Sequence, residues 1–205
     1  GVIDLIGNRA IIWQDDTLGS TFEQVPVPDE LLEQARHHRQ QLLEAIVEQD
    51  DGIMEKYLSG AELSREEIQS VLRKATLNMS VVPVLCGAGL RNKGIQPLLD
   101  SIVDYLPSPQ DVPPVEGVNP ETGEKESRRS SSDEPFAALA FKVAMDEGRK
   151  LTYLRVYSGK LETGEEVYNA TRQTKEKVAR LFKMHANKKE RIADVRAGDI
   201  IAAAG

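Results

Sequence analysis

The chain has 205 residues, 40% of them hydrophobic, which is enough for one large domain or two small ones with an ordinary core. No stretch approaches the ~18 continuous apolar residues of a membrane-spanning helix, and no basic region followed by an apolar run opens the chain, so we expect a soluble, unexported protein. The single cysteine, Cys86, cannot form an internal disulfide, which favours a cytoplasmic location.

The net charge of −7 conceals two parts of opposite sign, which separate at Pro135. Residues 1–134 contain 12 Lys and Arg against 24 Asp and Glu, whereas residues 135–205 contain 14 against 9. Such an asymmetry indicates different partners for the two parts, with a polyanion as a candidate for the basic part. An uneven distribution of charge without function explains the numbers equally well.

The first residues predict a small antiparallel sheet. Residues 1–6 and 10–13 are strand-like runs on either side of Gly7-Asn8, which favours a hairpin. Residues 21–25 add a third strand, which ends at the prolines that follow.

Three helices are predicted after this sheet. Asp29 is a candidate N-cap for an amphipathic helix that continues to about Gln49, and a second helix covers about 53–58. Ser64 and Glu67 form a capping box, and apolar residues then recur at helical spacing. Together these elements predict a small packed subdomain without catalytic machinery.

The segment 81–106 has the pattern of a strand, a loop and a helix. A β-branched run over 81–85 leads into Cys86-Gly87-Ala88-Gly89, and apolar residues then recur at helical spacing from Ile95 to Leu106. Small residues after a strand let a ligand approach backbone N–H groups, as in nucleotide-binding sheets. The loop lacks the second Gly and the hydroxyl residue of a phosphate loop, so its local chemistry identifies no ligand.

The sequence predicts neither a catalytic site nor a metal site. A nucleophilic Cys86 would need a base, and no histidine lies in a recognisable signature, so we expect a buried, inert thiol. His37 and His38 are adjacent on a helix and point in different directions, so they predict a solvated face.

Residues 108–134 are rich in proline and serine and read as a linker. From residue 135 the pattern changes to short alternating strands without intervening helices, which predicts a small barrel. The expected strands cover 136–144, 151–157, 166–170, 177–185 and 200–204. Alternation along the fourth strand places Val178 and Phe182 on one face and Leu181 on the other.

Basic residues gather at the end of this fourth strand and in the turn after it. They are Lys183, His185, Lys188, Lys189 and Arg191. A basic turn on a rigid barrel can lie along the phosphate backbone of a nucleic acid, with salt-dependent affinity and little sequence reading. A solubilising loop explains the same residues equally well.

Several long strings resemble bacterial translation elongation factor G, in order and over nearly the whole chain. They are LCGAGLRNKGIQPLLDSIVDYLPSP, DEPFAALAFKV, LTYLRVYSGKLETGEEVYN and MHANKKERIADVRAGDIIAAAG, and GVIDLIGNRAIIW and MEKYLSGAELSREEI look like the family's insert into its GTPase domain. The resemblance implies an α+β fold of two domains. Residues 1–107 would be the insert with the last strand and helix of an incomplete GTPase domain, 108–134 the linker, and 135–205 the second-domain β-barrel, with cuts before Gly1 and inside the last strand.

The resemblance also implies a nucleotide site. Gly87, Ala88, Gly89 and Leu90 occupy the guanine-side loop that usually reads C-G-S-A-[FL], with Ala88 in place of Ser and Gly89 in place of Ala. The implied contact runs mainly from backbone N–H to the guanine O6. GTP or GDP with Mg²⁺ would be the cofactors of the full-length protein. Its phosphate loop, switch regions and N-K-x-D motif would precede Gly1, so the fragment itself is expected to bind no cofactor and to be inactive.

In the full-length protein, the resemblance implies GTP-driven translocation of tRNA and mRNA on the ribosome. The barrel would contact small-subunit rRNA and the insert would meet the ribosomal stalk protein, whereas neither a membrane nor DNA is expected. One alternative is a related ribosome-bound GTPase that acts in recycling, ribosome protection or release-factor removal. Another is a free-standing RNA-binding barrel module.

Overall fold

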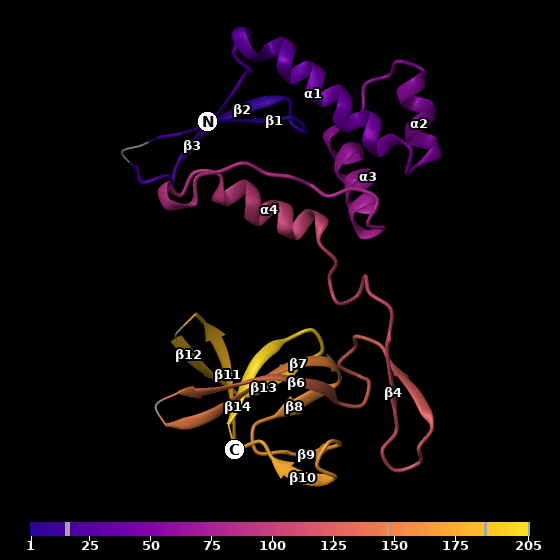
Figure 1. Cartoon of the computed structure of the whole chain (residues 1–205), viewed down its shortest axis with the longest axis vertical. Coiled ribbons are helices and arrows are strands. Elements are labelled where there is room, and N and C mark those ends of the chain that lie inside the picture. The colour runs from indigo at the N-terminus through magenta and orange to yellow at the C-terminus, as the bar shows by residue number, and fades with distance from the viewer. Residues whose placement is uncertain (15–16, 147, 187, 205) are drawn as a thin grey trace. The chain divides into compact units, whose positions relative to one another are not determined.

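The computed structural model of the chain describes residues 1–14, 17–146, 148–186 and 188–204. It divides into two compact units, Gly1–Leu106 and Pro107–Gly205 (Figure 1). The predicted α+β class is confirmed, because the first unit combines a small sheet with helices and the second is all-β. No helix in these ranges has the length and apolar character needed to cross a bilayer.

A three-stranded antiparallel sheet opens the first unit, as predicted. It contains β1 (Val2–Asp4), β2 (Arg9–Trp13) and β3 (Phe22–Val25) in that order. The turn between the first two strands is closed by Asp4, whose Oδ1 accepts the N–H groups of Ile6 at 3.1 Å and Gly7 at 3.0 Å. An Asp side chain that accepts hydrogen bonds from the next few backbone N–H groups mimics a backbone turn. Residues close in sequence therefore stabilise this hairpin.

Helices α1 (Asp29–Val47), α2 (Asp51–Leu58) and α3 (Arg65–Leu77) follow. The predicted capping box of α3 is confirmed, since Ser64 Oγ accepts the Glu67 N–H at 3.2 Å and Glu67 Oε2 accepts the Ser64 N–H at 2.7 Å. The predicted N-cap of α1 is wrong by one residue. Pro28 is the N-cap, in extended conformation, and Asp29 lies in the first turn, where the helix dipole favours a carboxylate.

The core of the first unit joins these helices to a fourth, α4 (Ile95–Tyr105). Arg39 of α1 also donates to the carbonyls of Leu5 and Ile6, which attaches the β1–β2 turn to the helices. Burial of apolar surface is the main stabilising contribution of such a cluster. Its buried members are Ile46, Val47, Leu63, Ile68, Val71, Leu72 and Tyr105.

The strand predicted over 81–85 is not present. In the described part of the chain no strand pairs with this segment, which runs without regular structure from α3 to a short turn, η2 (Gly89–Arg91). A strand exists only through hydrogen bonds to a neighbouring strand, so a β-branched run without a partner stays irregular. The predicted helix after the loop is confirmed as α4.

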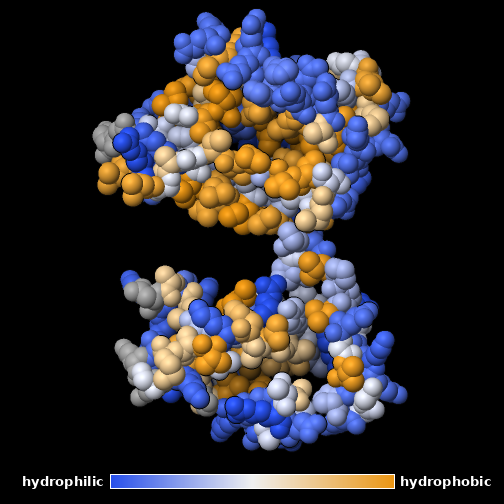
Figure 2. All heavy atoms as spheres, viewed as in Figure 1, coloured by the Kyte–Doolittle hydropathy of each residue, from blue (hydrophilic) through white to orange (hydrophobic). Residues whose placement is uncertain are grey.

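Apolar side chains gather over α4 and the segment before it (Figure 2). Such a patch is larger than the scattered apolar residues of ordinary surfaces. The exposed members are Val82, Val84, Leu85, Leu90, Leu98, Leu99, Ile102, Val103 and Leu106.

The predicted linker, residues 108–134, lies within the second unit and forms a hairpin of β4 (Val115–Val118) and β5 (Lys125–Arg128). Asn119 shapes its turn, because Oδ1 accepts the N–H groups of Glu121 at 2.8 Å and Thr122 at 3.2 Å. This segment is therefore partly regular structure.

A five-stranded antiparallel sheet dominates the second unit, in the order β12-β11-β14-β7-β6. Two two-stranded ribbons accompany it, β8 with β13 and β9 with β10. The strands are β6 (Ala137–Asp146), β7 (Arg149–Ser158), β8 (Lys160–Glu162), β9 (Glu166–Asn169), β10 (Thr174–Lys177), β11 (Arg180–His185), β12 (Lys188–Ile192), β13 (Asp194–Arg196) and β14 (Ile200–Ala204).

One core joins the sheet to its ribbons, as expected for a small barrel. The fourth predicted strand is interrupted between Lys177 and Arg180, so the expected side of Val178 is wrong. Its N–H donates to the Glu165 carbonyl at 2.9 Å, and its own carbonyl accepts from Gly164 at 2.8 Å, so this loop and not a strand neighbour orients the residue. The buried members of the core are Val156, Leu161, Val178, Leu181, Val195, Ile201 and Ala203.

Candidate functional site

The loop ahead of α4 is a closed turn. Ala88 N–H donates to the Lys93 carbonyl at 2.8 Å, and Lys93 N–H donates back to the Ala88 carbonyl at 3.2 Å. Asn92, between them, adopts the left-handed conformation with φ 55°, which Asn tolerates better than most residues. Two hydrogen bonds of its own therefore close the backbone of the predicted guanine loop.

Gly94 lets the end of this turn pack on its start. Its φ is +85°, and a Cβ at this position would lie 2.9 Å from the Cys86 carbonyl oxygen and 2.9 Å from the Gly87 Cα. Both the positive φ and the close approach require glycine. Helix α4 begins at the next residue.

Two of the four predicted loop residues lie at the start of η2. Gly89 and Leu90 are the first two residues of this turn, where backbone N–H groups lack acceptors within the helix. Both residues are exposed, and a Cβ on Gly89 would meet nothing nearer than Ile95 Cδ1 at 4.0 Å. The Ala88 N–H, by contrast, is engaged inside the loop.

The expected burial of Cys86 is wrong, because the thiol is exposed. It precedes the loop on the segment that forms no strand, so no sheet covers it. His37 and His38 are exposed as expected, with ring centroids 5.4 Å apart. Within the described residues, no three His, Cys, Asp or Glu side chains converge as metal ligands would.

The five predicted RNA-contact residues all lie on the β11–β12 hairpin and are all exposed. Its register pairs Lys183 with Glu190, His185 with Lys188, Met184 with Lys189 and Phe182 with Arg191. Residues directly opposite one another share a face, and side chains alternate along each strand. Lys183, His185 and Lys188 therefore share one face of the hairpin, and Lys189 and Arg191 share the other.

Carboxylates accompany part of this positive charge. Lys189 Nζ forms an ion pair with Asp146 of β6, and His185 Nε2 lies 3.6 Å from Glu190 Oε2. Exposed pairs of this kind contribute little to stability.

A row of residues across the five-stranded sheet was not predicted. The successive registers pair Lys142 with Tyr153, Tyr153 with Ala202, Ala202 with Phe182, and Phe182 with Arg191. These residues share one face, with a cation at each edge and two half-buried aromatic rings between. Lys142 Nζ lies 5.2 Å from the Tyr153 ring centroid, within cation–π range. The sequence shows the alternation within each strand, but it does not show which strands are neighbours in the sheet.

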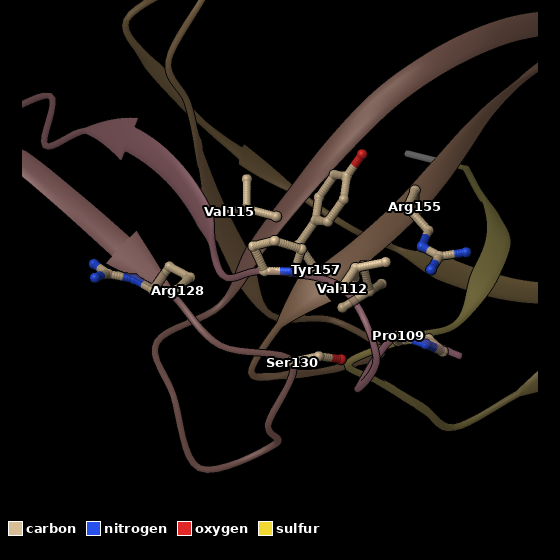
Figure 3. Close-up of a pocket in the computed structure, with 9 residues that line it drawn as sticks. Pro109, Val112, Val115, Arg128, Ser130, Arg155 and Tyr157 are labelled. Atoms are coloured by element: carbon tan, nitrogen blue, oxygen red, sulfur yellow. The ribbon is translucent and has the colours of Figure 1, made fainter. Parts of the chain in front are cut away.

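The hollows of the two units differ in size. Between residues 109–115 and β7 lies a cavity of about 40 Å³, and Figure 3 shows Arg128 and Arg155 extending from its rim in different directions. That volume suits water and not a ligand, since ligand pockets measure roughly 300–1,000 Å³. In the first unit, an open groove of about 310 Å³ runs between β1 and α1 and is lined by Ile3, Leu5, Leu31, Gln34, Ala35 and His38.

Comparison with known proteins gives matches along the entire chain. Residues 149–205 match the family model described as elongation factor Tu domain 2. The whole chain is 52% identical over 205 residues to elongation factor G 2 of Syntrophus aciditrophicus (strain SB), and it spans 30% of that relative's length. A crystal structure of a protein from Thermus thermophilus superposes with a TM-score of 0.75 at 28% identity, covering 100% of this chain and 27% of that one.

Proposed function

Because the whole chain is homologous to a segment of elongation factor G, we propose that it is part of a translational GTPase that drives movement of tRNA and mRNA through the ribosome. The observation that carries the proposal is the 52% identity over 205 residues, which includes both the loop before α4 and the β11–β12 hairpin. The GTPase activity belongs to the full-length protein.

The loop at Gly87, Ala88, Gly89 and Leu90 forms one wall of a guanine pocket in this proposal. The open space at Gly89 and the N–H groups at the start of η2 support it, because a base edge needs backbone donors without a side chain in front of them. In the full-length protein, the phosphates of GTP or GDP and the Mg²⁺ would bind outside this loop, where the phosphoryl chemistry would take place. This loop would only recognise the base.

The second unit contacts small-subunit rRNA. Support comes from the row that begins at Lys142 and ends at Arg191, because cations at the edges of an aromatic strip suit a phosphate backbone with unpaired bases beside it. Lys189 lies on the same face, whereas Lys183, His185 and Lys188 reach phosphates on the other side of the hairpin.

The first unit meets the ribosomal stalk protein. The apolar groove between β1 and α1 supports a protein partner, because its lining of Ile3, Leu5 and Leu31 offers little to a nucleic acid. The first unit is also acidic, with 9 Lys and Arg against 17 Asp and Glu in residues 1–106, which disfavours RNA there.

The test is a reconstituted translocation assay with the full-length protein and ribosomes that carry tRNA on a defined mRNA. We expect one-codon movement of the mRNA with GTP and much slower movement with GDP, measured by primer extension to the ribosome edge. The matched control replaces the protein with its own Gly89→Val variant.

The assay also separates the alternatives. Subunit splitting without codon movement would assign the protein to recycling, and rescue of antibiotic-inhibited or release-factor-blocked ribosomes would assign it to protection or factor removal. RNA binding without any nucleotide dependence would leave only the free-standing barrel and would overturn the proposal.

A further inference from the structure

Trp13 connects the N-terminal sheet to the start of α4. It lies on β2, is 5% exposed, and packs against Phe22 with ring centroids 5.9 Å apart. Its Nε1–H donates to Gln96 Oε1 at 3.1 Å, although the two residues are 83 positions apart in sequence. A buried indole N–H normally has a partner, and here the partner is an amide in the first turn of α4.

The amide of Gln96 completes a bridge to the turn between β2 and β3. Because Oε1 accepts from the indole, Nε2 is the donor, and it bonds the Gly19 carbonyl at 3.0 Å. Asn92 adds a second link, since its Nδ2 donates to the Leu18 carbonyl at 3.2 Å. The side chains of Asn92 and Gln96 therefore bond two successive carbonyl groups, those of residues 18 and 19.

Gly19 shows how closely this turn lies on the loop before α4. Its φ is +75°, and a Cβ there would lie 2.6 Å from the Arg91 carbonyl oxygen and 3.0 Å from the carbonyl carbon of Asn92. Only glycine permits that approach. Gly19 thus lies directly against the end of η2.

We propose that Leu18 and Gly19 form a clamp that holds loop 87–93 in its ligand-binding shape, with Trp13 and Gln96 as positioning residues. The inference rests on the proposed guanine-binding role of that loop. The clamp orders the loop before a ligand arrives, so the ligand does not have to supply the ordering free energy. Weakening the clamp therefore shortens the time that a nucleotide stays bound.

The experiment measures dissociation of a fluorescent GDP from the full-length protein by stopped flow. Trp13→Phe removes the N–H donor and keeps a ring, and Gln96→Met removes both amide bonds at similar volume. Trp13→Phe is expected to accelerate dissociation roughly 3- to 10-fold, the equivalent of one hydrogen bond, and Gln96→Met, which removes two, by at least as much. The double variant should be no faster than the faster single variant, because both changes break the same bridge.

Gln69→Met is the matched control. Gln69 Nε2 donates to Asp104 Oδ2 at 3.2 Å, near the other end of α4, so its loss weakens the attachment of the helix without touching the loop. Equal acceleration in this variant, or additive effects of Trp13→Phe and Gln96→Met, would overturn the clamp. So would unchanged dissociation in both single variants of a protein that retains GDP. If the unaltered protein does not retain GDP at all, the proposed function fails first and the clamp fails with it.

Discussion

Lys56 Nζ of α2 lies 2.7 Å from Oε1 and 2.8 Å from Oε2 of Glu67, the residue that closes the capping box of α3. The same Oε2 accepts the Ser64 N–H at 2.7 Å. One carboxylate therefore joins the side chain of one helix to the backbone start of the next. This arrangement makes the packing of α2 on α3 sensitive to the protonation of Glu67.

Acid should weaken the first unit partly through Glu67. The Lys56 ammonium, followed by the Ser64 N–H, holds the pKa of Glu67 below its ordinary value of 4.5. Because the folded-state pKa is lowered, this stabilisation is complete above pH 4.5 and is lost as the pH falls through the lower folded value. We expect the midpoint of urea unfolding to decline less between about pH 5 and pH 3 in Glu67→Gln than in the unaltered chain.

Glu62→Gln, an exposed carboxylate in the loop before α3, is the control for that titration and should keep the full decline. A residual decline remains expected in Glu67→Gln, because Lys74 also lowers the pKa of Asp50 and hydrogen bonding lowers that of Glu66. Identical curves for Glu67→Gln and the unaltered chain would contradict the prediction.

Two neighbouring isoleucines of β14 should differ widely in their contribution to stability. Ile201 is 2% exposed within the barrel core, whereas Ile200 is 54% exposed. Ile201→Ala removes buried methyl groups and leaves a cavity, which costs about 2–5 kcal/mol of unfolding free energy. Ile200→Ala should cost less than about 1 kcal/mol, mainly through strand preference. Chemical denaturation followed by circular dichroism measures both, and equal losses would mean that the strand faces are assigned wrongly.

Gly89→Val should weaken guanine nucleotides in the full-length protein. A branched side chain would stand beside the N–H groups at the start of η2, where the loss of one hydrogen bond costs up to roughly tenfold in affinity. The fold itself has room, since the nearest atom to an added Cβ is 4.0 Å away, so the melting temperature should not change. Gly117→Val, in β4 with nothing within 4 Å of an added Cβ, is the control. Unchanged nucleotide affinity at normal stability would show that the loop does not approach the base.

Charge reversal should distinguish the two faces of the β11–β12 hairpin. Arg191→Glu acts on the face that carries Tyr153 and Phe182, and Lys188→Glu acts on the opposite face. Because both faces are proposed to contact rRNA, we expect each variant to bind small subunits more weakly, with a salt dependence shallower by about one unit for each phosphate that it no longer neutralises. Lys125→Glu, exposed at the start of β5, should change neither quantity. If only Lys188→Glu alters the slope, the aromatic face does not bind the rRNA.

Features encoded within a few residues could be predicted from the sequence. The capping box of α3 depends on Ser64 and Glu67 alone, and the β1–β2 hairpin was predicted from the strand-like runs on either side of Gly7-Asn8. Both depend on residues that are close in sequence, so their spacing is sufficient to recognise them.

Features that depend on distant partners could not be predicted. The run over 81–85 has the composition of a strand, but a strand needs a neighbour that its own residues do not specify. The exposure of Cys86 follows from that missing neighbour. Val178 departs from alternation because Gly164 and Glu165 hold it. At the candidate site, the bridge from Trp13 to Gln96 could not be predicted either, because the two residues are 83 positions apart.

The exposed thiol of Cys86 offers a practical route to observing the loop. It is the only cysteine among the 205 residues and lies three positions before Gly89, so a maleimide dye would attach at one defined place in this segment. Its environment would change whenever the turn at Gly94 opens or a ligand approaches η2. Spectroscopy on that single label could follow the rearrangement of the loop in real time, separately from the occupancy of the nucleotide.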